Sequence, residues 1–411
     1  MISVREACER LVAQVQPGER ALLRLDHALN RVLAEDIASP LDFPIFDNSS
    51  MDGFAVIALD LTGASPESPV ILPVVGDIPA GTAPSMTLSR GQAARIMTGA
   101  PLPAGADAVI PVEATDHPRN SENQLLPDKV AIFHSALPGD YIRPHAQDFS
   151  AGHIVLKKGR WLAPQDIGLL AMLGVAQVPV FRRPKVALLS SGDEIVPVDQ
   201  PLLPGKIHDA NSHLLSALLN KCGVEIIPLG VARDNYADLE TRLDQAVLAH
   251  ADLILSTAGV SVGSFDFIRS VIADHGDIDF WQVNLRPGKP VAFGHYKNIP
   301  MLGLPGNPVS AFVGFEIFAR PVLARLQGLD EVRRLVVNAI IDEPIESDGR
   351  ESYLRVVLTN QEGVYHARLA SHQGSGNLLS LVLANALLIV PSEVKSLPAG
   401  TTLQAWAWEI S

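Results

Sequence analysis

The chain has little cysteine, little positive charge and no long apolar run. Cys8 and Cys222 are its only cysteines among 411 residues, which excludes a disulfide framework or a CxxC pair. A formal net charge of −13 argues against a general nucleic-acid or anionic-membrane surface, so we expect neither partner. No apolar run approaches the roughly 20 residues of a membrane span. The start, MISVREACER, carries charges where a signal peptide needs an apolar core, so we expect a cytoplasmic protein.

Histidine is present but not arranged for metal binding. The 12 histidines form neither an HExxH motif nor a His/Cys cluster, so a zinc site is not expected. A hydrophobic content of 47% indicates a folded chain, and 411 residues are too many for a single core.

The residue composition and the hydrophobic pattern change along the chain and predict a multidomain protein with α/β and β domains. The start and the stretch 164–173 have helical patterns, and Asp26 is placed to cap a further helix through Leu33. Proline, glycine and short β-branched runs fill the region between them. We predict a discontinuous helical/linker domain (1–45 and 148–180), an inserted β domain (46–147), a three-layer α/β/α domain with a mostly parallel sheet (181–327) and a small C-terminal β-barrel (328–411).

The stretch from Asp252 to Arg269, DLILSTAGVSVGSFDFIR, predicts a buried strand, a glycine loop and the start of a helix. Such a loop presents free backbone N–H groups to an anion, so we assign Gly259, Ser261 and Gly263 to substrate binding. It lacks the GK[ST] of a Walker A site and the GxGxxG of a dinucleotide fold. An ordinary strand-to-helix loop of small residues explains the pattern equally well.

Carboxylates follow several of the predicted sheet strands. Asp193 and Glu194 come after the strand 185–191, Asp234 precedes a helix, and Asp266 lies in a first helical turn. Because ligands of parallel sheets bind beyond the carboxyl ends of the strands, we expect Glu194, Asp234 and Asp266 to share a Mg²⁺ ion. The alternatives are a helix N-cap for Asp234 and an interaction with the helix dipole for Asp266.

Two proline–glycine turns follow in the predicted α/β domain. In RPGKP, the turn holds Arg286 and Lys289 close together as a candidate oxyanion clamp, although a solvated surface turn is the simpler reading. In LPGNPVS, structural needs explain most of the motif, since asparagine is a good N-cap and proline a good first helical residue. The turn still aims a helix N-terminus at the ligand end of the sheet. Its candidate substrate-binding residues are Pro305, Gly306, Asn307 and Pro308.

Polar residues outside the α/β domain complete the candidate set. NSSMDGFAV contains Asp52, and RIMTGAPLPAGAD contains Thr98 before a turn; a mere turn former explains Asp52 as well. The remaining candidates are Arg143 and Asp148 in RPHAQD, Arg355 in SYLRVVL and Ser375 in SHQGSG.

These fragments, in this order, resemble the molybdopterin molybdenumtransferase family, the MoeA-like proteins related to the gephyrin E domain. NSSMDGFAV, RIMTGAPLP, SSGDE, the AGVSVG loop, PGKP, LPGNPVS and HQGS match it and span nearly the whole chain. The resemblance implies the same four-domain architecture. It also implies conversion of adenylyl-molybdopterin and molybdate to molybdenum cofactor, with release of AMP and assistance by Mg²⁺.

The resemblance also implies roles for individual residues and for partners. It assigns catalytic roles to Asp52, Thr98, Glu194, Asp234 and Asp266. The family works as a homodimer whose active site is shared between subunits. The upstream adenylyltransferase and molybdoenzyme-specific chaperones are further candidate partners. The positions that correspond to substrate-binding motif residues are Arg143, Asp148, Arg286, Pro305, Pro308, Arg355 and Ser375.

Three positions depart from the family pattern. Gln282 and Arg286 stand where lysines are common, and Ala146 stands where glycine is frequent. The first two affect oxyanion affinity and leave the preference between molybdate and tungstate open. Two alternative functions stay open. The α/β domain resembles that of the adenylylating proteins, which implies a molybdopterin adenylyltransferase, and the missing lysine at Gln282 favours a non-catalytic pterin-binding or scaffolding protein.

Overall fold

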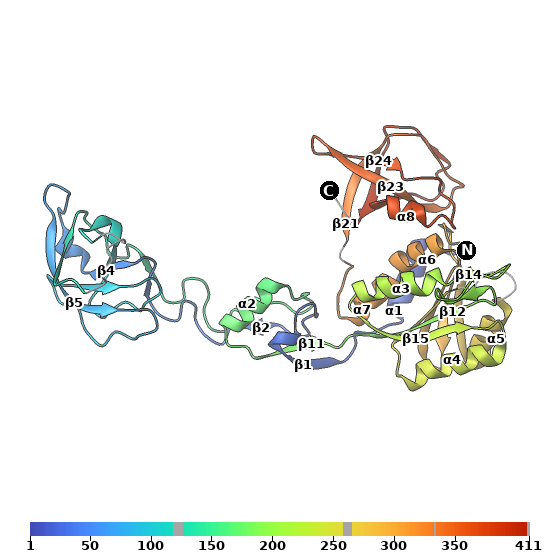
Figure 1. Ribbon diagram of the computed structural model, residues 1–411, viewed down its shortest axis with the longest axis horizontal. Helices are drawn as coiled ribbons and strands as arrows, with labels where there is room; N and C mark the ends of the chain where they lie inside the picture. The colour runs from blue at the N-terminus through green and yellow to red at the C-terminus, as the bar shows by residue number, and fades with distance from the viewer. Residues whose placement is uncertain (118–125, 258–264, 333, 409–411) are drawn as a thin grey trace. The chain divides into compact units, whose positions relative to one another are not determined.

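The computed structural model describes residues 1–117, 126–257, 265–332 and 334–408, and of residues 265–269 and 281 the backbone alone. Contacts divide the chain into two compact units, residues 36–157 with 172–174, and the remainder (Figure 1). Among the described residues, no helix has the length and apolarity needed to cross a membrane.

The unit of residues 36–157 is built on a five-stranded sheet of order β7-β4-β6-β5-β8. Phe54, Val56 and Ile110 contribute to the buried apolar core of this sheet. Glycine is required at position 53, where β4 pairs with β7, because a Cβ there would lie 1.9 Å from the Ile110 carbonyl oxygen. The strands are β4 (Gly53–Val56), β5 (Val70–Ile78), β6 (Ala93–Ile96), β7 (Ala108–Pro111) and β8 (Lys129–Ile132), with the short pairs β3 (Asn48–Ser49) and β9 (Ile142–Arg143), and β2 (Ile37–Ala38) and β10 (Ile154–Leu156).

The other unit contains a six-stranded sheet of order β15-β12-β16-β20-β19-β17. Its first four strands are parallel, and β19 and β17 are antiparallel to their neighbours, so the prediction of a mostly parallel sheet is confirmed. The strands are β12 (Lys185–Ser191), β15 (Glu225–Ala232), β16 (Leu253–Thr257), β17 (Gly276–Gln282), β19 (Pro290–Tyr296) and β20 (Ile299–Leu304).

Helices cover both faces of this sheet because its strands are apolar on both sides. Val186 and Leu188 of β12 pack into one core, and Ala187 and Leu189 pack into the other. The first core is closed by α1 (Val4–Ala13), α3 (Ala210–Lys221), α6 (Pro308–Gly314), the π-helical turn η4 (Phe315–Ala319) and α7 (Arg320–Leu326). The second core is closed by α4 (Tyr236–Leu248) and α5 (Phe265–His275).

The C-terminal strands form a closed barrel, as predicted. The order β23-β24-β21-β27-β25 closes because β25 also pairs with β23. The barrel strands are β21 (Leu335–Ile341), β23 (Glu351–Gln361), β24 (Val364–Leu369), β25 (Ala386–Val390) and β27 (Thr402–Ala407). The short strand β18 (Leu285–Arg286) leaves the α/β region and pairs with β23, and helix α8 (Leu379–Leu383) precedes β25. The last pair is β22 (Ile345–Glu346) with β26 (Ser396–Leu397).

The linker region differs from the prediction in its helices. The helix expected at 26–33 is wrong: only the 3-10 turn η1 (Leu25–His27) forms, because the backbone N–H groups of Asn30 and Leu33 donate to the carbonyl oxygens of Leu162 and Arg160 at 3.0 and 2.9 Å. Helix α1 packs into the α/β core, so α2 (Pro164–Met172) is the one helix of the described linker outside it. Strand β1 (Arg20–Arg24) pairs with β11 (Gln177–Phe181), which joins distant parts of the sequence. The exact boundaries of the four predicted domains stay a prediction.

Candidate functional site

Carboxylates from two loops meet at the carboxyl ends of β12 and β15. Asp193 and Glu194 directly follow β12, Asp234 follows β15, and Asp193 Oδ1 accepts the Asp234 backbone N–H at 3.4 Å. Partial burial raises the pKa of Asp234, and the neighbouring charges of Asp193 and Glu194 raise it further. The structure therefore places two of the three predicted metal ligands, Glu194 and Asp234, at the same edge of the sheet.

Asp234 is not a helix cap. Asn235 occupies the N-cap position of α4, and its Oδ1 accepts from the backbone N–H of Asp238 at 3.0 Å. The prediction that Asp234 caps a helix is therefore wrong. The carboxylate of Asp234 is instead close to the negative charges of Asp193 and Glu194. Concentrated like charge of this kind favours a bound cation.

Asp266 lies in the first turn of α5, as predicted, but its side chain lies outside the described residues. The whole AGVSVG loop, with the predicted residues Gly259, Ser261 and Gly263, also lies outside the described residues. Within the described part of the chain, no three His, Cys, Asp or Glu side chains form a metal-binding group by themselves. Glu194 and Asp234 are still of the residue type that Mg²⁺ uses, since it binds through one or two carboxylates together with substrate phosphate oxygens. The three-carboxylate site stays a prediction.

Buried hydroxyl groups lie beside this edge of the sheet. Ser190 Oγ is 2.7 Å from Ser212 Oγ and 2.9 Å from Thr257 Oγ1, so it joins β12 to α3 and β16. The hydroxyl oxygens of Ser191 and Ser256 are buried without a hydrogen-bond partner among the described residues. A native protein rarely leaves such groups unsatisfied. They are therefore available to a ligand at this edge of the sheet.

The LPGNPVS turn is fixed from two sides. Asn211 of α3 is buried, and its Nδ2 donates to the Gly306 carbonyl oxygen at 2.6 Å. Asn307 occupies the N-cap position of α6 but makes no side-chain cap, since its Nδ2 donates to Ser375 Oγ at 3.0 Å. The backbone N–H of Val309 also donates to the Ser375 carbonyl oxygen, at 3.2 Å. Thus the SHQGSG loop of the barrel docks on the start of α6, and Ser375 joins the predicted turn residues.

The RPGKP turn packs against this same start of α6. A Cβ on Gly288 would lie 3.4 Å from Ser310 Cβ and 3.5 Å from Pro305 Cγ, and Gly288 has φ +108°. Arg286 is half-buried, whereas Lys289 is exposed. The exposed Gln282 ends β17, where it pairs with Pro290. The structure thus holds Arg286 close to the ligand edge of the sheet.

Arg355 is the largest fully buried side chain of the described residues. Its Nε donates to Ser380 Oγ and its Nη2 to the Gly374 carbonyl oxygen, each at 3.0 Å. Among the described residues no carboxylate pairs with it. Burial, together with the nearby charge of Arg286, lowers the pKa of Arg355 to about 10. Two neighbouring cations, of which the buried one has no carboxylate partner among the described residues, have the charge that an oxyanion requires.

The unit of residues 36–157 contains its own group of candidates. Asp52 Oδ1 accepts from the backbone N–H of Thr98 at 2.8 Å and from Thr98 Oγ1 at 2.7 Å. The segment 98–101 lies beside β3. Asn48 of β3 pairs with Arg143 of β9 and also forms a β-bridge with Pro101. This unit thus brings Asp52, Thr98 and Arg143 into one region, each at least partly accessible.

Asp148 is exposed, and its backbone N–H donates to the Phe43 carbonyl oxygen at 2.9 Å. No contact within the described residues joins its side chain to the Asp52–Thr98 pair. Ala146, two residues before it, has φ +58°. The left-handed conformation explains why glycine suits this position better than alanine.

Sequence reasoning missed Asn211, and it noted Asp193 after the strand 185–191 without assigning it a role. Asn211 holds Gly306 across 95 residues of sequence, and Asp193 acts directly on Asp234. The signal for Asn211 is its place in the first turn of a helix whose N-cap is Asp209, directly after a polar loop. The signal for Asp193 is its position beside Glu194 in SSGDE.

Comparison with known protein families gives matches along almost the whole chain. Residues 2–174 match the MoeA N-terminal region (domain I and II), residues 187–325 a probable molybdopterin binding domain, and residues 338–408 the MoeA C-terminal region (domain IV). Molybdopterin molybdenumtransferase 2 of Mycobacterium tuberculosis is 40% identical over 99% of both chains. Molybdopterin molybdenumtransferase of Haemophilus influenzae is 36% identical over 98% of both.

Solved structures agree with these sequence matches. A crystal structure of the molybdopterin biosynthesis MoeA protein from Pyrococcus horikoshii OT3 has a TM-score of 0.82 at 29% identity, covering 99% of this chain and 100% of that one. The similarity therefore extends over the entire length of the molecule rather than over a single domain.

Proposed function

The chain belongs to the MoeA family of molybdopterin molybdenumtransferases and inserts molybdenum into molybdopterin, and we propose that adenylyl-molybdopterin and molybdate are its substrates and AMP its released product. The proposal rests mainly on one observation. Glu194 and Asp234 follow β12 and β15 at the carboxyl edge of the sheet, and the turn that carries Arg286 and the loop that binds Arg355 both pack against the start of α6, which follows β20 at the same edge. We place the reaction in the cytoplasm, where the free thiols of Cys8 and Cys222 stay reduced.

The cationic group is suited to hold molybdate. Arg355 is fixed by Ser380 and Gly374, so its guanidinium needs little reorganisation when an oxyanion arrives. Arg286 adds a second charge from the RPGKP turn. A bound dianion would offset both the desolvation of Arg355 and the repulsion between the two arginines.

The carboxylate group is suited to hold Mg²⁺ beside the substrate's pyrophosphate. When bound there, the ion neutralises phosphate charge and polarises the bond to be cleaved. Glu194 and Asp234 would hold the ion, with Asp266 as the predicted third ligand. Asp193 raises the proton affinity of Asp234, and Asn211 keeps the Gly306 turn in place beside both groups.

Release of AMP from adenylyl-molybdopterin by the purified protein tests this proposal. We expect release that requires both molybdate and Mg²⁺, and that falls at least about 100-fold in Asp234→Asn. No AMP release by the wild-type chain from fresh substrate would refute it. ATP turnover with bare molybdopterin would instead indicate an adenylyltransferase. Binding of molybdopterin without either reaction would indicate a scaffolding protein.

We further propose that the protein acts as a homodimer with Asp52 and Thr98 contributed by one subunit and Asp234 by the other. The resemblance to the family supports this proposal. Asp52→Ala and Asp234→Ala variants, each inactive alone, should regain roughly a quarter of wild-type activity after unfolding and joint refolding, because half of the dimers carry one intact site. No recovery from a mixture that forms dimers would refute the shared site.

A further inference from the structure

A cavity of about 480 Å³ lies between the α/β helices and the C-terminal barrel. Its volume is in the range of small-molecule sites. Phe312 and Trp408 form one aromatic wall, with their ring centroids 5.7 Å apart. Apolar side chains from α3, α8, β21, β25 and β27 complete the lining: Leu218, Leu335, Leu381, Leu387 and Trp406.

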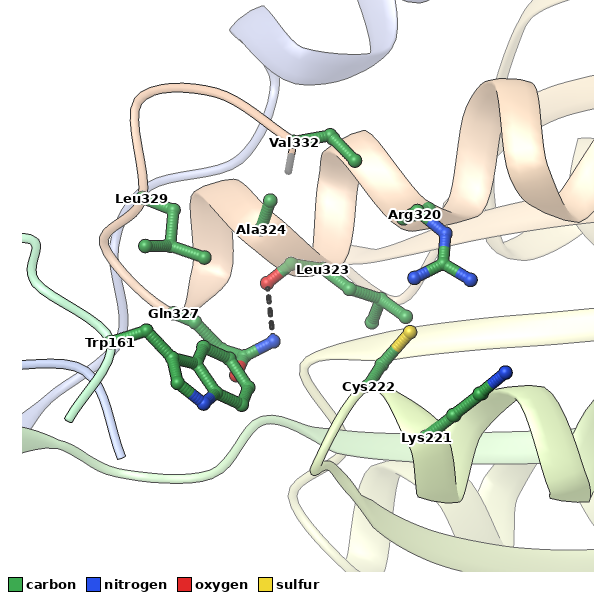
Figure 2. A pocket seen from close by; sticks show the side chains of 9 residues that line it. All are labelled: Trp161, Lys221, Cys222, Arg320, Leu323, Ala324, Gln327, Leu329 and Val332. Carbon is green, nitrogen blue, oxygen red and sulfur yellow. Dashed lines mark hydrogen bonds between the residues drawn. The ribbon is translucent and has the colours of Figure 1, made fainter. Parts of the chain in front are cut away.

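A second, smaller hollow of about 190 Å³ shares part of its lining with this cavity. Figure 2 shows the side chains that line the smaller hollow. Both hollows are lined by Lys221 and Arg320, so these two cations lie where the hollows meet. Trp161 lies at the opposite end of the smaller hollow. Gln327 does not add an amide donor, because its Nε2 donates to the Leu323 carbonyl oxygen at 3.2 Å.

The charged groups of the cavity do not balance. Its described lining includes Lys221, Arg320 and Arg334, but only one carboxylate, Glu316. Arg320 is paired with Glu316, with Nη2 and Oε1 2.6 Å apart. Lys221 pairs with no carboxylate of the described residues. In a chain of net charge −13, this local excess of positive charge is unusual.

Arg334 is the cation that most needs an anion. Its guanidinium stacks on Trp406, 3.7 Å from the ring centroid, and its Nε is buried without a partner among the described residues. Burial lowers the pKa of Arg334, the charge of Arg320 lowers it further, and Glu316 offsets only part of this. An anion in the cavity would relieve that cost.

We propose that this cavity binds a small organic anion with an aromatic ring. The ring would pack between Trp408, Phe312 and the leucine side chains, and the anionic group would lie near Lys221 and Arg334. None of the cavity residues is among the residues assigned above to molybdenum transfer. The site is therefore separate from the proposed active site, and its ligand need not be a substrate.

Binding of 8-anilinonaphthalene-1-sulfonate (ANS) to the folded full-length protein tests the proposal. We expect saturable fluorescence enhancement with one molecule per chain. Lys221→Glu should weaken binding by at least about tenfold, because reversing a charge beside a bound anion is worth on the order of 1.4 kcal/mol. Lys395→Glu is the matched control: it reverses an exposed lysine that lines neither hollow and should leave binding unchanged.

A second pair of measurements separates ring recognition from charge. Trp408→Ala should weaken ANS binding, while the uncharged analogue N-phenyl-1-naphthylamine should bind equally well to wild type and Lys221→Glu. Molybdenum transfer should be retained in both variants, so failure here is distinguishable from failure of the proposed function. Unchanged ANS affinity in Lys221→Glu and in Trp408→Ala would overturn the proposal.

Discussion

Replacing Arg355 with methionine tests the oxyanion pocket without creating a large void. Burial and the nearby charge of Arg286 lower the pKa of this guanidinium from its ordinary value to about 10. Since one pKa unit corresponds to about 1.36 kcal/mol, keeping the charge costs about 3 kcal/mol in the ligand-free protein. The two hydrogen bonds to Ser380 and Gly374 are worth about 1.5 kcal/mol each, because their donor is charged. These contributions cancel, so the variant should keep the wild-type stability within about 1 kcal/mol.

The effect of molybdate should then differ between the two proteins. At a molybdate concentration 100 times the dissociation constant, binding stabilises the wild type by about 2.7 kcal/mol, which corresponds to a rise in Tm of about 5 °C. Arg355→Met should show almost none of this rise. Differential scanning calorimetry with molybdate, and with sodium chloride at equal ionic strength, measures it.

A matched control is available on the same barrel. Arg368 is exposed on β24, next to β23, and Arg368→Met should respond to molybdate as the wild type does. The reasoning is refuted if molybdate raises the Tm of Arg355→Met and of the wild type by the same amount.

Three further substitutions test individual parts of the structure. Because the folded-state pKa of Asp234 is raised, the contribution of Asp234 to stability is present at low pH and is lost as the pH rises through that pKa. Asp193→Asn removes a neighbouring negative charge and so lowers this pKa. The variant should therefore raise the free energy of unfolding at pH 7 by roughly 0.5 kcal/mol, seen as a higher Tm in calorimetry, and should leave it unchanged at pH 3. Ala146→Gly relieves φ +58° and should stabilise its unit by about 1 kcal/mol in urea unfolding, whereas a loss of stability would contradict the strain. Asn211→Ala frees the Gly306 turn and should lower kcat by about tenfold with KM little changed, partly restored by Asn211→Ser; equal kcat values would remove Asn211 from the account.

The α/β sheet was predictable from sequence because its strands are short, continuous apolar runs. The strand predicted at 185–191 matches β12 residue for residue. Once the strands are parallel, the loops after β12, β15 and β20 must lie at one edge, so the meeting of Glu194 with Asp234 follows from topology. Strand β19 was not predicted from the sequence. It contains Gly294, and only the paired structure shows why glycine stands there, because a Cβ would lie 2.0 Å from the Asp277 carbonyl oxygen of β17.

The contacts that complete the site could not be predicted from local patterns. Arg355 reads as one residue of a barrel strand, and its partners Ser380 and Gly374 are 25 and 19 residues away. Helix α1 has a clear amphipathic stripe, but the stripe does not say that its partners are α7 and η4. After Asp26, pairing with a distant segment replaces the predicted helix, because the backbone N–H groups of Asn30 and Leu33 donate to Leu162 and Arg160.

The position of the metal ion is the most direct test of the central claim. Crystals of the protein soaked with Mn²⁺ and AMP should show an anomalous peak within about 2.5 Å of carboxylate oxygens of Glu194 and Asp234. The account predicts that Asp266 completes the same site from the start of α5. A peak elsewhere, with Asp266 pointing away from this edge of the sheet, would contradict it.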